Sequence, residues 1–191
     1  GRRAAVVLGT GIGGIGTIDE GSERLYAEGK DRLHPLTIPR LMPSAAASQV
    51  SMECGVRGPV FGVTSACASA NHALGLAFQL VRSGAVDLAL AGGAEACLTF
   101  LSFKAWEALR VCDPETCRPF SMGRKGMVLG EGAALFVLVP LELAQARNLP
   151  ILAELAGFCM SADAADIVAP SADGMAAAMR AALADAGLAP E

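Results

Sequence analysis

Short apolar runs alternate with amphipathic stretches along the chain. Five of the apolar runs have the length of buried strands, and most of them stop at glycine or at a polar residue. They are residues 4–8, 60–64, 86–91, 135–139 and 151–158. Strands that alternate with helices predict an α/β layered fold around a buried sheet.

Helical periodicity fills most of the intervals between these runs. Apolar residues recur three or four positions apart through residues 68–82, and Gly84 follows where that helix would end. The other predicted helices are residues 19–28, a stretch from about residue 44, and residues 103–110, 142–147 and 174–186.

The composition is that of a core-rich, slightly acidic protein. Of the 191 residues, 53% are hydrophobic and 18% are charged, and the net charge is −4. Proteins that track a phosphate backbone are normally basic, so we expect no nucleic-acid partner. The apolar runs are far shorter than the roughly 20 residues of a membrane-spanning helix, so we expect no membrane span.

Six cysteines are present, at positions 54, 67, 97, 112, 117 and 159. No CxxC pair and no Cys/His ligand spacing occurs among them, so we expect neither a metal site nor a redox dithiol. The sequence opens directly into its first apolar run, without the pattern of a secretory signal. Reduced thiols in a cytoplasmic protein are therefore the expectation.

A glycine-rich loop follows the first predicted strand. Gly9, Gly11 and Gly14 satisfy the pattern GxGxxG, which begins a dinucleotide-binding fingerprint. That fingerprint also needs a second strand ending in an acid about twenty residues later. Residues 28–35 are instead polar and bounded by proline, so a dinucleotide-binding oxidoreductase is disfavoured. Glycines that allow a backbone or a ligand to approach closely are the simpler interpretation.

Cys67 lies at the joint between a predicted strand and a long predicted helix. The partial positive charge at the start of a helix favours a thiolate, and the small neighbours of Cys67 leave room for a substrate. A buried structural cysteine is the alternative, and composition alone favours it. His72 would lie about 140° from Cys67 around the helix. His34 precedes a proline in a loop, so neither histidine is a well-placed base.

Residues 64–71, with the sequence TSACASAN, resemble the active-site elbow of elongating β-ketoacyl-[acyl carrier protein] synthases. Other segments match the same family in order and spacing, and the resemblance covers essentially the whole chain. These segments are residues 11–16, 57–59, 89–95, 117–120, 128–133, 156–158 and 161–163. Such linked motifs are far more specific than any one of them alone.

The resemblance implies a thiolase-like layered fold made of two similar α/β halves. Residues 1–150 would form the N-terminal half, truncated at its start, and residues 151–191 would begin the second half. The sequence is therefore interpreted as an internal fragment. The family is usually homodimeric, and the strand at residues 59–64 resembles the one that pairs across the two-fold axis.

The resemblance also implies the chemistry. Cys67 would accept an acyl group from acyl carrier protein, and the acyl-enzyme would then condense with malonyl-carrier protein after loss of carbon dioxide. No cofactor is expected, because the acyl groups arrive on the phosphopantetheine arm of the carrier. Ile12 would gate the acyl pocket. Arg32 and Arg110 match basic positions that could meet the acidic carrier, or they are ordinary solvated arginines.

Some features of the family are missing or altered. Its two catalytic histidines, a nearby lysine and an oxyanion-hole segment belong to the second half and do not occur here, so we expect no condensation by this fragment alone. Ser121, Lys125 and Met127 replace two acids and an aromatic residue of the usual pattern. These changes fit a specialised synthase, such as a nodulation-type enzyme, as readily as the housekeeping one.

Two related classes remain as alternatives. A non-condensing partner subunit would share the fold, but such subunits usually lack the cysteine that is present here. A thiolase-type acyltransferase also uses a cysteine, but residues 118–120 and 130–133 resemble synthases.

Overall fold

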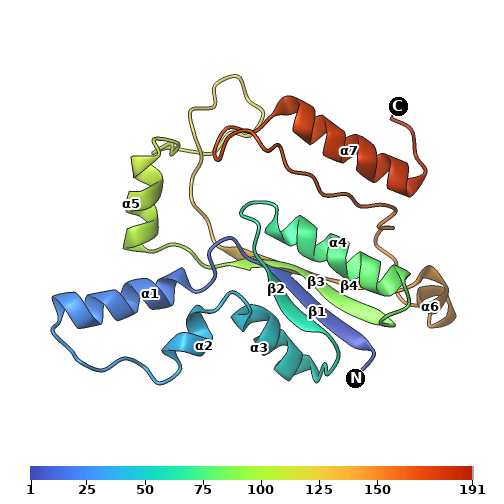
Figure 1. The fold of residues 1–191 in the computed structure, drawn as a ribbon, viewed down its shortest axis with the longest axis horizontal. Helices are drawn as coiled ribbons and strands as arrows, with labels where there is room; N and C mark the ends of the chain where they lie inside the picture. The colour runs from blue at the N-terminus through green and yellow to red at the C-terminus, as the bar shows by residue number, and fades with distance from the viewer. Residues whose placement is uncertain (191) are drawn as a thin grey trace.

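The computed structural model describes residues 1–190, and its centre is one mixed four-stranded sheet (Figure 1). The strand order is β2-β1-β3-β4. β1 pairs in parallel with both β2 and β3, whereas β4 runs antiparallel to β3. The strands are β1 (Ala4–Gly9), β2 (Val60–Val63), β3 (Leu88–Glu95) and β4 (Gly132–Leu138). Four of the five predicted strands and the α/β class are thus confirmed.

Helices occupy most of the intervals where helical periodicity predicted them. They are α1 (Ile15–Ser22), continued by the π-helical turn η1 (Glu23–Ala27), α2 (Thr37–Leu41), α3 (Ala45–Cys54), α4 (Ser69–Arg82), α5 (Phe100–Ala108), α6 (Leu141–Ala146) and α7 (Ala172–Ala186). Four begin earlier than predicted, namely α1, α5, α6 and α7. α5 starts at Phe100 because the Thr99 hydroxyl accepts a hydrogen bond from the Ser102 N–H and caps the helix.

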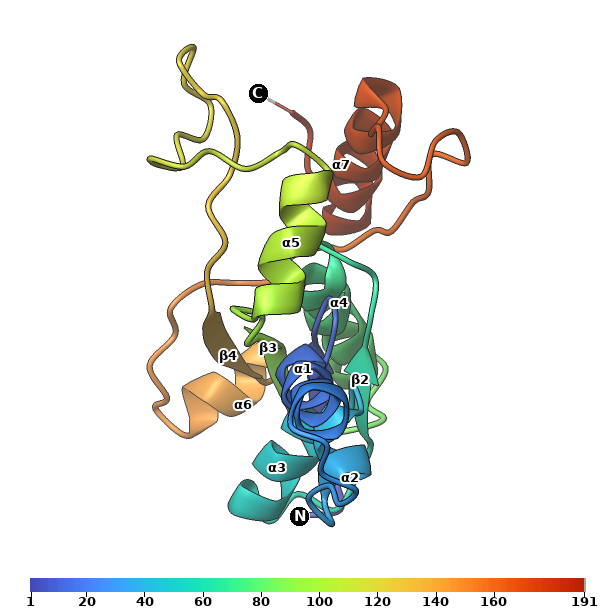
Figure 2. The same cartoon turned by 90° about the vertical axis from the view of Figure 1, so that its left-hand side faces the viewer.

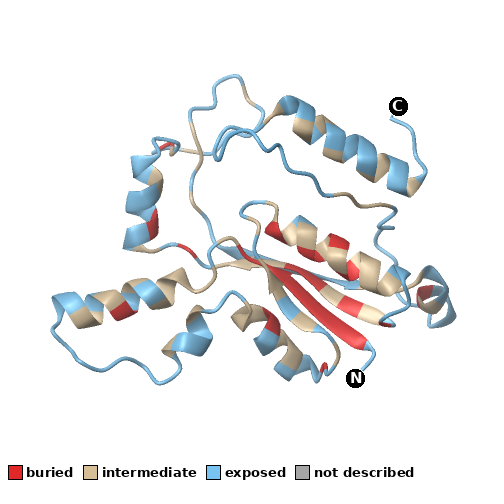
Figure 3. Cartoon of the chain, in the orientation of Figure 1, coloured by how far each residue is buried: buried red, intermediate tan, exposed pale blue. Residues whose placement is uncertain are grey.

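The hydrophobic core lies on both faces of β1. Ala5 and Val7 pack with Ala73 and Ala77 of α4 on one face. Ala4, Val6 and Leu8 face the other way and pack with Ala47 of α3. Figure 3 shows β1 buried along its length. A strand covered on both faces is uniformly apolar, which explains why this run could be recognised without any alternation.

Two glycines allow the first turn of α4 to rest directly on the ends of the strands. A Cβ on Gly9 would lie 2.3 Å from the backbone carbonyl of Ser69. A Cβ on Gly93 would lie 2.7 Å from the Cβ of Ala70. No side chain fits in either space, so glycine at these two positions sets the height of the helix above the sheet.

The predicted strand at residues 151–158 is wrong. These residues form neither a helix nor a strand, and Leu152 is largely exposed. The N–H of Phe158 donates to the carboxylate of Asp185, at 3.0 Å, where a strand would need a carbonyl partner. An apolar run becomes a strand only where a neighbouring strand can pair with it, and within residues 1–190 none lies beside this one.

α7 lies beyond α4 on the side away from the sheet, as both views show (Figures 1 and 2). The loop between α5 and β4 extends on that same side. Leu135, Phe136 and Val137 of β4 remain exposed. The division at residue 150 stays a prediction.

Candidate active site

The site forms where three parallel strands end. The glycine loop follows β1, the elbow with Cys67 follows β2, and β3 ends at Glu95. The carboxyl ends of parallel strands meet at one edge of a sheet, where α/β proteins place their ligands. The loop and the elbow lie close together there, because a Cβ on Gly11 would lie 3.9 Å from the carbonyl oxygen of Ala66.

The elbow presents Cys67 at the surface on a sharp turn. Ala66 has a φ of 51°, in the left-handed region that residues with a Cβ seldom adopt. Cys67 is exposed, and α4 begins two residues later at Ser69. The chain therefore reverses direction at Ala66 and leaves the thiol on the outside of the turn.

Ser69 holds this turn together, a role that sequence reasoning missed. Its hydroxyl donates to the Ala66 carbonyl at 2.6 Å and accepts from the Ser65 N–H at 2.8 Å. Ser69 itself is buried. A serine at the first turn of a helix was the available signal, since such side chains commonly bond nearby backbone groups.

The two histidines have other partners than Cys67. Nδ1 of His72 lies 2.7 Å from the Ser65 hydroxyl, and its ring meets Phe158 edge to face with centroids 6.4 Å apart. Nδ1 of His34 accepts from the Leu36 N–H in an exposed loop. These contacts agree with the expectation that neither histidine serves Cys67 as a base.

The glycine loop is held by Glu95, the second residue that sequence reasoning missed. One carboxylate oxygen accepts from the Gly11 N–H at 2.6 Å, and the other accepts from the Thr10 hydroxyl at 2.9 Å. Ile12 projects from this loop and is 46% exposed. An acid two positions after the glycine pair of β3 was the signal in the sequence, but its partners lie 84 and 85 positions away.

Arg32 and Arg110 lie on separate segments. Arg32 is in the loop between η1 and α2, and Arg110 follows α5 with a φ of 57°. Both are exposed, and neither side chain forms a hydrogen bond or an ion pair within residues 1–190. The altered positions Ser121, Lys125 and Met127 all lie in the loop between α5 and β4.

Cys97 differs from Cys67 in its surroundings. Burial raises the pKa of the Cys97 thiol, and the carboxylates of Glu95 and Glu131 raise it further. Its sulfur lies 3.5 Å from the Gly130 carbonyl. Cys97 is therefore a buried thiol with a raised pKa, whereas Cys67 is exposed.

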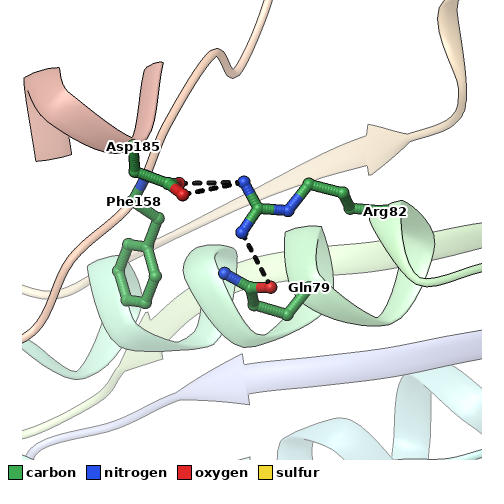
Figure 4. A network of polar contacts seen from close by, with 4 residues as sticks. All are labelled: Gln79, Arg82, Phe158 and Asp185. Atoms are coloured by element: carbon green, nitrogen blue, oxygen red, sulfur yellow. Dashed lines mark hydrogen bonds and ion pairs between the residues drawn. The ribbon is translucent and has the colours of Figure 1, made fainter. Parts of the chain in front are cut away.

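A polar network joins α4 to the segments that follow the sheet (Figure 4). A guanidinium nitrogen of Arg82 lies 3.0 Å from both carboxylate oxygens of Asp185, and another donates to Gln79. The Phe158 N–H lowers the pKa of Asp185, and Arg82 lowers it further. The network thus fixes Phe158 above α4.

Residues 1–190 contain no cluster of three or more His, Cys, Asp or Glu side chains placed to hold a metal ion. No helix among them has both the length and the apolar character needed to cross a membrane.

Fold and site together define an α/β protein that presents a cysteine on a strand-to-helix turn at the carboxyl edge of its parallel strands. Residues 1–144 match the family model described as "Beta-ketoacyl synthase, N-terminal domain". The chain belongs to this family, which confirms the resemblance found in the sequence.

Three known proteins illustrate the relationship. "Nodulation protein E" of Rhizobium sp. (strain N33) is 53% identical over 97% of this chain and 46% of its own length. "3-oxoacyl-[acyl-carrier-protein] synthase 2" of Staphylococcus aureus is 40% identical over 99% of this chain and 49% of its own length. A solved complex of a type II polyketide synthase acyl-carrier protein with its ketosynthase matches with a TM-score of 0.90 and 34% identity, over 100% of this chain and 50% of that chain. The chain spans about half the length of the curated relatives it matches.

Proposed function

We propose that the protein carrying this chain is a β-ketoacyl-[acyl carrier protein] synthase in which Cys67 accepts the acyl group. The observation that carries the proposal is the exposed thiol of Cys67 on a left-handed turn, directly beside the glycine loop. A nucleophile that forms a covalent intermediate must be presented in this way to a substrate carbonyl. Buried Cys97 does not meet that requirement.

The first step is a transfer between thioesters. The Cys67 thiolate attacks the carbonyl carbon of an acyl thioester on carrier protein, and a bond forms between that carbon and the Cys67 sulfur. The bond to the phosphopantetheine sulfur breaks, and the departing thiolate takes up a proton. The Cys67 N–H stabilises the oxyanion of the tetrahedral intermediate. No cofactor of the enzyme takes part.

The second step is a decarboxylative condensation. Malonyl-carrier protein loses carbon dioxide, and its carbanion attacks the acyl group on Cys67 and releases the thiolate. Hydrogen-bond donors directed at the malonyl thioester are needed as charge develops there. The two histidines of this chain contact Ser65 and Leu36 instead, so this step depends on groups beyond residues 1–190.

The synthase is a specialised, nodulation-type enzyme and not the housekeeping one. Higher identity to the nodulation protein, 53%, than to the synthase of S. aureus, 40%, supports this assignment. Ser121, Lys125 and Met127 support it too, because they change charge and size in one loop beyond the sheet.

The carrier protein and a second copy of the protein are the proposed partners. The name of the S. aureus relative includes an acyl carrier protein, and the polyketide ketosynthase was solved with one. Arg32 and Arg110, both exposed, would face its acidic surface. β2 forms an edge of the sheet, so a homodimer would pair it with its symmetry mate. Six free cysteines support a reducing, cytoplasmic location.

Mass spectrometry of the full-length gene product tests the proposal. Incubation with an acylated carrier protein should add one acyl group, located on Cys67 by peptide mapping. Cys67→Ser should abolish the adduct, whereas Cys117→Ser, which changes another exposed thiol, should retain it. An adduct concentrated on Cys112 or Cys159 would contradict the proposed function.

A further inference from the structure

We propose that Glu95 is a positioning residue that fixes Ile12 beside the turn that carries Cys67, and thereby controls which acyl chains reach Cys67. The inference rests on the proposed function and extends it to a residue at the end of β3. Glu95 itself touches no reacting atom in this scheme. It acts through the backbone of the glycine loop.

The hydrogen bonds on both sides of Ile12 lead to this single carboxylate. The N–H of Gly11, immediately before Ile12, donates to Oε2 of Glu95 at 2.6 Å. The N–H of Gly13, immediately after Ile12, donates to the Thr10 hydroxyl at 3.0 Å. That hydroxyl in turn donates to Oε1 of Glu95 at 2.9 Å. The backbone before Ile12 is therefore tied to Glu95 directly at the Thr10–Gly11 peptide group, and the backbone after it is tied through Thr10 at the Ile12–Gly13 peptide group.

A carboxylate suits this role better than a neutral group. All three links run in one direction, from a donor in the loop to an acceptor, and both oxygens of Glu95 are used. Bonds to an ionised acceptor are stronger than neutral ones. An amide at position 95 would offer the Gly11 N–H only a neutral oxygen, and its NH₂ group would reverse the hydrogen bond with the Thr10 hydroxyl, so the loop would be held more weakly.

Ile12 needs such an anchor because its own contacts do not fix it. Its side chain is 46% exposed, so packing holds it only in part. The flanking glycines have wide conformational freedom, and an untethered loop would sample many positions. The far end of the loop is tied separately, by the Gly14 N–H to the Leu41 carbonyl at 3.2 Å. Glu95 is thus the anchor on the side that lies close to the elbow.

The experiment measures whether Ile12 and Glu95 act together. Acylation of Cys67 in the full-length gene product is timed with hexanoyl and hexadecanoyl groups loaded on an acyl carrier protein. Ile12→Phe should slow the long chain by at least roughly tenfold relative to the short one, since the larger ring fills more of the space beside that turn. In the Glu95→Gln background the same change should slow it by less than about threefold, because the loop can now move aside.

Glu131→Gln is the matched control. Glu131 also lies near Cys97, but its carboxylate accepts from the Leu98 N–H and not from the glycine loop. Ile12→Phe should keep its full effect in that background. Equal effects of Ile12→Phe in the parent and in Glu95→Gln would overturn the inference. So would the absence of any chain-length effect in the parent.

A second pair of variants covers the case in which Glu95→Gln fails to fold. Thr10→Val removes the link from Gly13 while leaving the Gly11 bond, and Thr10→Ser restores the hydroxyl. The valine variant should weaken the effect of Ile12→Phe and the serine variant should restore it. Identical behaviour of the two variants would overturn the inference. If Cys67 of the parent accepts no acyl chain, the proposed function fails and the inference falls with it.

Discussion

The ring of Phe158 lies over Gly75 of α4, where a Cβ would be 2.1 Å from the Cζ of the ring. The same ring contacts His72, which lies one helical turn closer to Cys67. Nδ1 of His72 forms a hydrogen bond with the Ser65 hydroxyl. The segment around Phe158, which follows β4 in the sequence, therefore packs on α4, the helix that begins two residues after Cys67. Only glycine at position 75 leaves room for the Phe158 ring to pack there.

Replacement of Gly75 by Ala should destabilise the protein, although alanine is the better helix former by about 1 kcal/mol. The new methyl group would overlap Phe158 and push its ring away from α4. In the background of Phe158→Ala the overlap is absent, so the same replacement should stabilise by about 1 kcal/mol. Urea unfolding of the four variants measures the change. The same sign in both backgrounds would show that the ring does not rest on Gly75.

Gly9→Ala should displace the turn that carries Cys67. Its Cβ would meet the backbone of Ser69 at 2.3 Å, and a backbone carbonyl cannot move aside as a side-chain end can. We expect a loss of about 1–3 kcal/mol or more in unfolding free energy, together with slower acylation of Cys67. Gly130→Ala is the control, since its Cβ would meet nothing within 4 Å. Comparable losses in the two variants would argue against a close approach of α4 to β1.

The contact between α4 and α7 should weaken in acid. The pKa of Asp185 is lowered in the folded protein, first by the Phe158 N–H and then by Arg82. Its stabilising effect is therefore fully present above the pKa of an unfolded aspartate, about 3.9, and is lost as the pH falls through the lower folded value. Melting temperatures of the parent and Asp185→Asn should differ at pH 6 and converge towards pH 2. Glu154→Gln, which changes an exposed carboxylate, should show no such convergence. A constant difference would exclude Asp185 as the titrating group.

The elements of the sheet could be predicted from the sequence because β1 is buried on both faces and its apolar run has no interruption. Cys67 could be placed for a similar local reason, since it follows one apolar run and precedes one amphipathic stretch. Residues 151–158 show where an apolar run is not enough to predict a strand. Their apolarity matched that of a strand, but pairing depends on a neighbour that the pattern does not describe.

The residues that hold the glycine loop and the segments above α4 could not be predicted from the sequence, for a different reason. Glu95 and Thr10 are 85 positions apart and meet only because β1 and β3 are neighbours in the sheet. Arg82 and Asp185 are 103 positions apart. Neither pair has a local spacing that a motif could capture. Sequence patterns located Cys67 between a strand and a helix, whereas the groups that hold its turn depend on the topology.

Ser69→Ala should loosen the elbow and slow acylation of Cys67. The hydroxyl of Ser69 satisfies both the Ser65 N–H and the Ala66 carbonyl, and it does so in a buried position. Its removal leaves the Ser65 N–H without that partner, whereas the Ala66 carbonyl keeps the Ser69 N–H at 3.1 Å, for an expected loss of about 1–3 kcal/mol in unfolding free energy. Ala66 would also lose the bond that helps to hold its left-handed conformation. The acylation rate of Cys67 should therefore fall by more than the stability loss alone explains.

Two variants separate this role from a general effect of losing a serine. Ser83→Ala removes a hydroxyl that donates to Leu80 at the exposed end of α4, and its effect on stability should stay within about 0.5 kcal/mol. Ser69→Thr keeps the hydroxyl and should recover much of the acylation rate. Rates are compared at a temperature where every variant is folded by circular dichroism. A Ser69→Ala variant that is destabilised yet acylated at the parental rate would show that the turn keeps its shape without the hydroxyl. The left-handed conformation of Ala66 would then be held by the packing of α4 against Gly9 and Gly93.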